Sequence, residues 1–554
     1  MQGASEIPAT FLLALVSSVL LTLLMMPAVV RLALRLGAVD HPDERKVHLQ
    51  AVPRMGGLAF LATMLLIPLT MLDITQTTQG FLLGLLIVGF TGMADDIFQI
   101  SPKLKFIGII AGSAVFLIMS GTAITDLGDL FARGNIETGW FAIPLTLIAM
   151  VGFINALNLS DGLDGLAAGI TLIASFFLGS FAITIGDHES LMIVVVLLGS
   201  MVGFLYYNSH PARIFMGDTG SLILGYVLAC LSLMLLQSGG GEVISPISMG
   251  ILLGLPLADT IYVMLRRIVQ GKSPFLPDKT HFHHRLIDLG LSHNGVVGVF
   301  YGLIYMYGCV AVLFQGSAGW LQSLVLAGLI AVTYLGLMLL ERANFSYAPL
   351  TDDDASTGSD GTGSSIYYLM TRVLGASIPV MTWLIPLLLL GPVLAVDLSG
   401  INILIVVAVM GLVGLLYPWR GGRDGAWPLG LLYLLVFALI LAINTSEQLW
   451  VQYYMYAISA LLSCWVALKL WFKRHTRIFL TSGFESLLLL LTWVTPWITG
   501  RLNLLSDDIQ VMFYVACVES VIFLLATKIV LRRQPRRNRH LLASLLLLLG
   551  VALL

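Results

Sequence analysis

Charged residues are scarce in this sequence. Only 11% of its 554 residues are charged, against about 25% in soluble proteins, and 58% are hydrophobic. The formal net charge of −2 gives no basic surface for a nucleic-acid partner. Apolar runs of about 20 residues, the length of a membrane-crossing helix, recur along the chain. The sequence therefore predicts an all-α, polytopic integral membrane protein.

Cysteine is also rare. The four cysteines lie inside apolar runs with no paired spacing, which excludes a disulfide framework and a cysteine-based zinc site. The N-terminus lacks the basic region and the small-residue cleavage site of a signal peptide, so we expect its first apolar run to be a retained span.

The spacing of apolar runs predicts two membrane regions. Residues 1–342 hold about 11 expected spans, one of them over Ile244–Leu265. Residues 343–366 form an acidic, Gly/Ser/Thr-rich segment that is typical of a flexible linker. Residues 367–554 hold about six further spans of unknown role. Basic residues follow the first run, so the positive-inside rule places the N-terminus outside and the polar motifs on the cytoplasmic side.

One polar stretch interrupts the apolar pattern at residues 155–169. Amides and carboxylates recur there at intervals of three, at Asn155, Asn158, Asp161 and Asp164. Residues three apart share a face of a helix. Charge beside a membrane span is costly and usually functional, so we interpret this stretch as one wall of a site.

Two further motifs place carboxylates at expected span ends. Asp95 and Asp96 end one span, either as ligands of a metal or phosphate or as ordinary interfacial charges. Asp218 lies in Gly217–Ser221, before an apolar helix. Glycine-flanked backbone there suits a phosphate and the carboxylate suits Mg²⁺, while a helix cap is the alternative.

The remaining polar groups lie late in the first region. Asp259 is expected about 10 Å inside a span, either contacting ligand or paired with a basic residue. A cluster of three histidines and an arginine follows, and it resembles a phosphate grip more than a zinc site: His281, His283, His284 and Arg285. Together the motifs suit a Mg²⁺-dependent site for phosphate esters. A secondary transporter with cytoplasmic-facing acidic sites is the alternative.

The motifs at residues 94–96, 155–167, 215–222 and 281–284 resemble those of the polyprenyl-phosphate N-acetylhexosamine-1-phosphate transferases. The order and spacing match over roughly residues 8–342. The Arg45–His48 and Pro53–Gly57 segments, with the His-x-His-His form, look most like the bacterial undecaprenyl-phosphate GlcNAc-1-phosphate transferase branch. Nothing after residue 366 resembles the family.

The resemblance implies transfer of HexNAc-1-phosphate, with GlcNAc favoured, from a UDP-sugar to undecaprenyl phosphate with release of UMP. This is the first membrane step of a cell-envelope polysaccharide, such as O-antigen, at the bacterial inner membrane. The cofactor implied is Mg²⁺, with Mn²⁺ as an alternative. The C-terminal region could serve a homodimer or an envelope-assembly partner.

The resemblance also implies residue roles. Asp218 is the principal metal ligand and Asn158 a second one. Asp95 and Asp96 orient the acceptor lipid. Asp161 and Asp164 line the uridine and metal pocket. The expected substrate-binding residues are Lys103, Lys105, Asn155, Asn208, His281, His283, His284 and Arg285.

Overall fold

The computed structural model describes residues 9–40, 51–239, 244–273 and 280–343, together with parts of 455–462 and 510–522. The chain divides into two compact units, Met1–Ala348 and Pro349–Leu554. The expected linker and nearly all of the expected C-terminal membrane region lie outside the described residues, as does the Arg45–His48 segment. The predicted domain boundaries therefore stay predictions.

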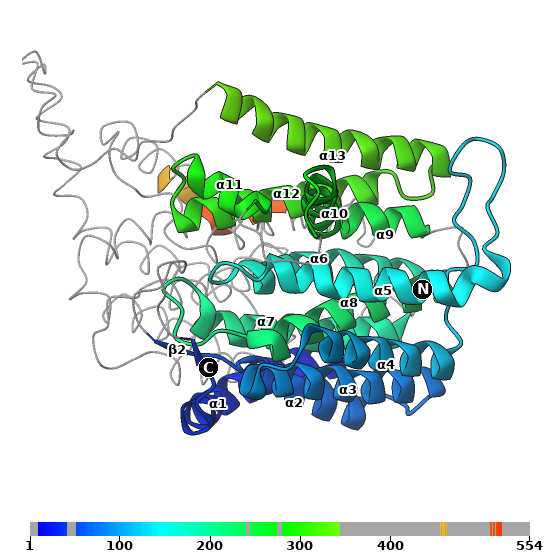
Figure 1. The fold of residues 1–554 in the computed structure, drawn as a ribbon. Coiled ribbons are helices and arrows are strands. Elements are labelled where there is room, and N and C mark those ends of the chain that lie inside the picture. The colour runs from blue at the N-terminus through cyan, green and yellow to red at the C-terminus, as the bar shows by residue number, and fades with distance from the viewer. Residues whose placement is uncertain are drawn as a thin grey trace, which may run out of the picture. The chain divides into compact units, whose positions relative to one another are not determined.

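Helices make up almost all regular structure in the described part of the first unit (Figure 1). The long helices of its first half are α1 (Ala9–Leu36), α2 (Gly57–Met71), α3 (Gln76–Phe98), α4 (Pro102–Ser120), α5 (Ala142–Ser160) and α6 (Leu166–Ile185). Its second half contains α7 (His188–Asn208), α8 (Gly217–Ser238), α9 (Pro246–Leu252), α10 (Gly254–Val269), α11 (Phe282–Asp288), α12 (His293–Leu313) and α13 (Gly319–Arg342). The short elements are β1 (Val39–Asp40), β2 (Val52–Pro53) and the 3₁₀ turn η1 (Gly139–Phe141).

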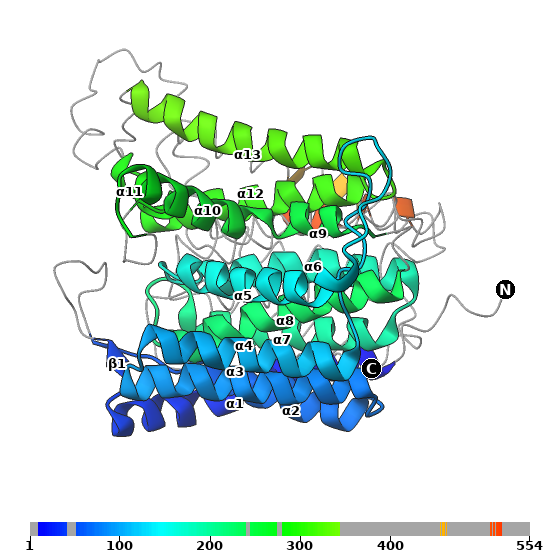
Figure 2. The ribbon, with the colours of Figure 1, turned by 45° about the vertical axis from the view of Figure 1, so that its right-hand side comes forward.

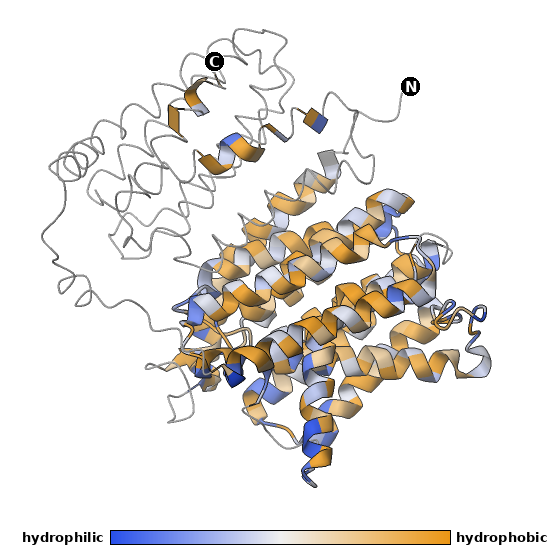
Figure 3. Cartoon of the chain, turned by 90° about the horizontal axis from the view of Figure 1, so that it is seen from above, coloured by the Kyte–Doolittle hydropathy of each residue, from blue (hydrophilic) through white to orange (hydrophobic). Residues whose placement is uncertain are grey.

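The helices have the lengths that a membrane protein requires. Nine in the described residues are long and apolar enough to cross a bilayer, and α2 is a shorter apolar helix. The long helices lie side by side in two views, and apolar residues cover much of their length (Figures 2 and 3). The prediction of a polytopic all-α membrane protein is confirmed.

Helix α8 lies at the centre of this bundle. It packs against α2, α3, α5 and α6, and its side chains from Thr219 to Leu235 are all buried. A helix that is apolar on every side can be stable only where other helices or lipid surround it. The burial of α8 fixes where its N-terminus, with Asp218, emerges from the bundle.

The expected span over Ile244–Leu265 is not one straight helix. Helix α9 ends at Leu252, α10 begins at Gly254, and the two axes meet at 78°. Pro256 explains the break, because a proline ring clashes with the carbonyl four residues earlier, here that of Leu252. The expected span is therefore broken, and the break places Asp259 in a helix with its own direction.

A backbone contact brings residues 53–57 to the start of α8. Strand β2 pairs with β1 in antiparallel register. The Phe215 N–H donates to the Pro53 carbonyl, and the Gly56 and Gly57 N–H groups donate to the carbonyls of Phe215 and Met216, each at 2.9 Å. A Cβ on Gly57 would collide with the Gly220 backbone. Glycine therefore allows this segment to lie directly on the α8 N-terminus.

Candidate active site

Lysine 105 joins two carboxylates from different helices. Its Nζ, in the first turn of α4, lies 3.2 Å from Asp95 Oδ2 at the end of α3 and also contacts Asp218 Oδ1 at the start of α8. Asn158, at the end of α5, lies beside Asp218, and its Oδ1 accepts a hydrogen bond from Ser221 Oγ at 3.2 Å. Four expected site residues from four helices thus meet at one end of the bundle.

Asp96 has a different environment from Asp95. It is 1% exposed, and its two oxygens accept the backbone N–H groups of Asp218 and Thr219, both at 2.9 Å. Thr219 Oγ1 also donates to it at 2.6 Å. These N–H groups belong to the first turn of α8, where backbone N–H groups have no acceptor within their own helix. Asp96 is therefore a helix cap supplied by α3, and it fixes the backbone on both sides of the Asp218 side chain.

Asp161 follows α5 and faces the same acidic group. Burial raises the pKa of Asp161 to about 8, and the negative charges of Asp218, Asp164 and Asp96 add to this effect. In the described residues no hydrogen bond from another side chain compensates. A carboxyl group destabilised by neighbouring carboxylates is suited to receive a cation.

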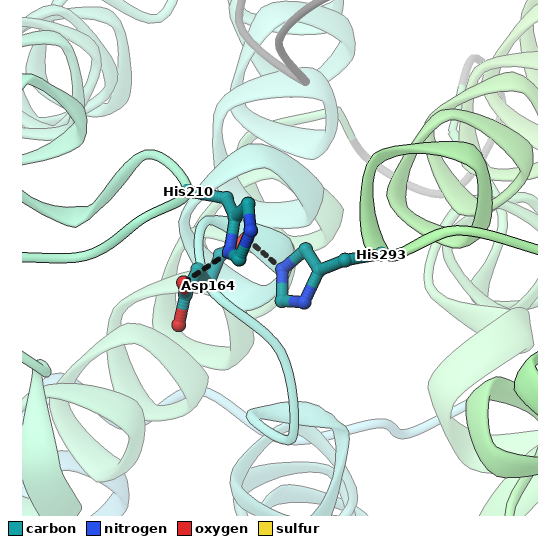
Figure 4. A group of neighbouring side chains, drawn as sticks. All are labelled: Asp164, His210 and His293. Atoms are coloured by element: carbon teal, nitrogen blue, oxygen red, sulfur yellow. Dashed lines mark hydrogen bonds and ion pairs between the residues drawn. The ribbon is translucent and has the colours of Figure 1, made fainter. Parts of the chain in front are cut away.

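Asp164 belongs to a separate group with two histidines (Figure 4). His210 Nδ1 donates to Asp164 Oδ2 at 2.7 Å, and His293 Nε2, from the start of α12, donates to the Asp164 carbonyl at 3.3 Å. The Ala212 N–H donates to the same carboxylate at 3.1 Å. Burial alone would raise the pKa of Asp164, but these hydrogen bonds and the nearby imidazoles hold it below its usual value.

The ligand atoms of this second group lie within 4.8 Å of one another. Two imidazoles and one carboxylate suit a transition metal better than Mg²⁺. Both imidazoles, however, already hydrogen-bond to Asp164, and their rings stack with centroids 4.1 Å apart. The hydrogen bonds of this group therefore link the 161–165 loop to the segment after α7 and to the start of α12.

Helix α11 carries the predicted histidine and arginine cluster. His281 and His283 are buried, with parallel rings whose centroids lie 5.9 Å apart, and His284 lies 4.3 Å from His283. Burial, and then the neighbouring imidazole of His284, lowers the pKa of His283 to about 3, so this ring is neutral at physiological pH. The cluster is therefore less cationic than its sequence indicates.

Arg285 is already occupied by a carboxylate. Its Nε and Nη2 donate to the two oxygens of Glu341 at 2.7 and 2.6 Å, and its guanidinium lies over the Tyr262 ring at 5.3 Å. Its Nη1 is buried and has no hydrogen-bond partner in the described part of the chain. The guanidinium of the predicted phosphate grip is therefore largely committed to Glu341 and enclosed by the protein.

A close contact joins the histidine cluster to the acidic loop. A Cβ on Gly162 would lie 2.5 Å from His283 Nε2. Only glycine leaves room for this imidazole between Asp161 and Leu163. The contact brings together two motifs that are about 120 residues apart in the sequence.

Three predicted substrate-binding residues stand apart from these contacts. Lys103 is exposed at the start of α4. Asn155 is half-buried one turn before Asn158. Asn208 is buried, accepts from the Gly165 N–H at 2.9 Å and donates to the Ile214 carbonyl at 3.0 Å. Its amide therefore ties two loops together, and a role of all three in substrate binding stays a prediction.

Sequence reasoning gave no role to several residues that shape the site. They are Thr219, His210, His293 and Glu341. Thr219 lies within the Gly217–Ser221 motif, and His210 lies shortly before it. Their closeness to this motif is the sequence feature that could have indicated a role in the site. His293 and Glu341 had none, because their partners are 129 and 56 residues away.

The donor set fits a hard divalent cation. Asp95, Asp218, Asp161 and Asn158 supply only oxygen ligands, which Mg²⁺ prefers. Lys105 contacts two of these carboxylates. Burial, followed by the charges of neighbouring carboxylates, raises the pKa of Asp161. Asp96 is excluded from this set because its oxygens are committed to the start of α8.

Comparison with known proteins agrees with this arrangement. The glycosyl transferase family 4 profile matches residues 78–236, which include Asp95, Asn158 and Asp218. A Bacillus subtilis protein described as a probable undecaprenyl-phosphate N-acetylglucosaminyl 1-phosphate transferase is 38% identical over 341 residues, 61% of this chain and 94% of the relative.

Two other relatives differ in the lipid or the transferred group that their names state. The Mycobacterium tuberculosis decaprenyl-phosphate N-acetylglucosaminephosphotransferase is 34% identical over 359 residues, 58% of this chain and 87% of its own length. A phospho-N-acetylmuramoyl-pentapeptide-transferase of Clostridium perfringens is 32% identical over 318 residues, 53% of this chain and 94% of its own. The chain belongs to glycosyl transferase family 4, in the bacterial branch of polyprenyl-phosphate N-acetylglucosamine-1-phosphate transferases.

Proposed function

We propose that this protein transfers GlcNAc-1-phosphate from UDP-GlcNAc to undecaprenyl phosphate and releases UMP. The observation that carries the proposal is the meeting of Asp95, Lys105, Asn158 and Asp218 at one end of a membrane-helix bundle. The names of the relatives support the reaction class, the GlcNAc group and a polyprenyl-phosphate acceptor. The relatives give no support to the transporter alternative.

The phosphate of the lipid attacks the β-phosphorus of the sugar nucleotide. A new P–O bond forms to the lipid phosphate, and the bond between the two phosphates of the nucleotide breaks, so UMP leaves. A phosphate monoester is already largely dianionic at pH 7, because its second pKa is about 6. No general base is required, so we assign Asp95 to orienting Lys105 and the acceptor.

Charge neutralisation is the main task of the site. Asp218, with Asn158 and Asp161 nearby, would hold Mg²⁺, and the ion would supply positive charge beside the transferring phosphoryl group. Lys105 attracts the incoming lipid phosphate, and the α11 histidines face the nucleotide diphosphate. Asp164, fixed by His210 and His293, shapes the adjoining nucleoside pocket.

We also propose a bacterial inner-membrane location. The basic residues after the first span support a cytoplasmic-face site and an external N-terminus. The product would start a cell-envelope polysaccharide. We propose a partner-binding role for residues 367–554, because the relatives align with only 53–61% of the chain.

One assay tests the proposal. The purified full chain is incubated in detergent micelles with undecaprenyl phosphate, MgCl₂ and radiolabelled UDP-GlcNAc, UDP-GalNAc or UDP-MurNAc-pentapeptide, and both UMP and lipid-linked product are measured. UDP-GlcNAc is expected to give both products, and EDTA is expected to stop their formation. Failure of every donor in the presence of Mg²⁺ contradicts the enzyme assignment, while preference for another donor corrects the substrate.

A further inference from the structure

Asp259 is a buried carboxylate to which the proposed reaction gives no role. It lies in α10, six residues beyond the break at Leu253, and is 3% exposed. Its Oδ2 accepts from His281 Nδ1 at 2.8 Å, and its Oδ1 accepts from the Phe282 N–H at 2.9 Å and from Tyr334 Oη at 3.2 Å. No Lys or Arg is paired with it in the described residues, so the predicted basic partner is absent there.

These contacts determine the form of His281. An ionised carboxylate can only accept hydrogen bonds, so His281 Nδ1 must carry the proton that points at Asp259. A hydrogen bond at one ring nitrogen fixes the tautomer and orients the ring. His281 Nε2 has no hydrogen-bond partner among the described residues. It is therefore the nitrogen that remains for a substrate.

Asp259 also fixes the beginning of α11. The Phe282 N–H belongs to the first turn of this helix, where it has no partner within the helix. Glu341 holds the other side of α11 through Arg285. Two carboxylates from α10 and α13 thus hold α11, but only Asp259 touches a histidine ring.

We propose that Asp259 is a positioning residue for the transfer reaction, which holds His281 with Nδ1 protonated and so aims Nε2 at the sugar nucleotide. The inference rests on the proposed function. The hydrogen bond at Nδ1 fixes the tautomer and the orientation of the ring, and a hydrogen bond to an ionised carboxylate is of the stronger kind.

Asp259→Asn distinguishes an effect on the orientation of His281 from an effect on the stability of the fold. The amide oxygen can still accept from Phe282 and Tyr334, but the amide NH₂ now faces His281 Nδ1. The imidazole must then accept at Nδ1, which reverses its tautomer, so Nε2 presents a hydrogen to the substrate instead of a lone pair. We expect kcat to fall about 10- to 100-fold, the range for losing one charged hydrogen bond. The Tm and the KM for undecaprenyl phosphate are expected to stay at the wild-type values.

A double-mutant cycle shows whether Asp259 acts through His281. His281→Gln and the double variant Asp259→Asn/His281→Gln are expected to have the same kcat, because the carboxylate has no imidazole left to orient. Tyr334→Phe is the matched control, since it removes a hydrogen bond to the same carboxylate without touching His281. Its kcat is expected within about twofold of wild type, as for a weak neutral hydrogen bond.

Several outcomes overturn the inference. They are a wild-type kcat in Asp259→Asn, additive losses in the cycle, or an equal loss in Tyr334→Phe. If Asp259→Asn lowers the Tm, Asp259→Glu decides instead: partial recovery of kcat with the restored charge supports the inference, and none contradicts it. A wild-type chain that is inactive on every UDP-sugar contradicts the proposed function, whereas an active wild type with an unaffected Asp259→Asn contradicts this inference alone.

Discussion

Asp96 Oδ2 accepts both hydrogen bonds that Thr219 can donate to it, from the backbone N–H at 2.9 Å and from the hydroxyl at 2.6 Å. This pairing fastens the end of α3 to the start of α8. The neighbouring Asp95 instead contacts Lys105. Two adjacent acidic residues therefore have different environments: Asp96 holds the start of α8, and Asp95 contacts Lys105.

The same substitution at the two positions is expected to give different results. Asp96→Asn places an NH₂ group against an N–H donor of α8 and should lower the free energy of unfolding by about 1–3 kcal/mol, the cost of an unsatisfied buried donor. Asp95→Asn should leave the Tm nearly unchanged and reduce turnover. Thermal unfolding of both variants in detergent, beside UMP release, checks this. Equal Tm losses would contradict this difference between the two residues.

Removing the central carboxylate tests the metal site. Asp218→Asn is expected to abolish turnover while the protein still folds, because a Mg²⁺ ligand is lost. Its metal-free Tm should be somewhat below that of wild type, since the ion pair with Lys105 is lost. The rise in Tm that MgCl₂ gives to wild type should disappear. Normal turnover in this variant would remove Asp218 from the metal role.

The roles of Lys105 and Lys103 can be distinguished by replacing each lysine in turn. Lys105→Gln should reduce turnover about 100-fold or more, the scale for losing a charged group at a transferring phosphoryl group. It should not weaken Mn²⁺ binding, measured by electron paramagnetic resonance, because the lysine charge opposes a nearby cation. Lys103→Gln is the control, since this side chain is exposed. A greater loss in the control would assign the lipid phosphate to Lys103.

The contact between Gly162 and His283 predicts a sharp steric effect. A Cβ at position 162 would lie 2.5 Å from His283 Nε2, so Gly162→Ala must displace the imidazole or the loop. Turnover should fall about tenfold or more, as expected for a misplaced catalytic group. Gly152→Ala in α5 is the matched control, because a Cβ there meets nothing within 4 Å. Full activity in Gly162→Ala would show that the contact is dispensable.

His283 makes stability depend on pH. Its pKa is about 3 in the folded protein, below the ordinary value of 6.5, so the unfolded chain binds the extra proton first. The contribution is complete above pH 6.5 and is lost as the pH falls, by about 2 kcal/mol at pH 5. His283→Gln should flatten the decline of Tm between pH 7 and 5, whereas the exposed His188→Gln should not. Parallel curves for wild type and His283→Gln would exclude this source.

The fold class and most of the site could be predicted from the sequence, because polar residues are conspicuous at the ends of apolar runs. The 78° break between α9 and α10 was missed although Pro256 was visible, since hydropathy records length and not direction. The task of Asp96 could not be read either, because its partners are 122 and 123 residues away. The sequence likewise did not indicate that Arg285 pairs with Glu341, which lies 56 residues away. The motifs indicated which polar groups meet in the fold, but not which of them already have a hydrogen-bond partner.

The order of the motifs along the chain has a consequence for biogenesis. The carboxylates of the site lie between Asp95 and Asp218, whereas α11, which packs against the Gly162 loop through His283, comes later. Membrane chains are made from the N-terminus onward. A nascent chain that ends before residue 281 therefore contains the acidic wall without the helix that faces it. Such a precursor lacks the α11 side of the candidate site, so we expect activity only after the last helices of the first unit have been made.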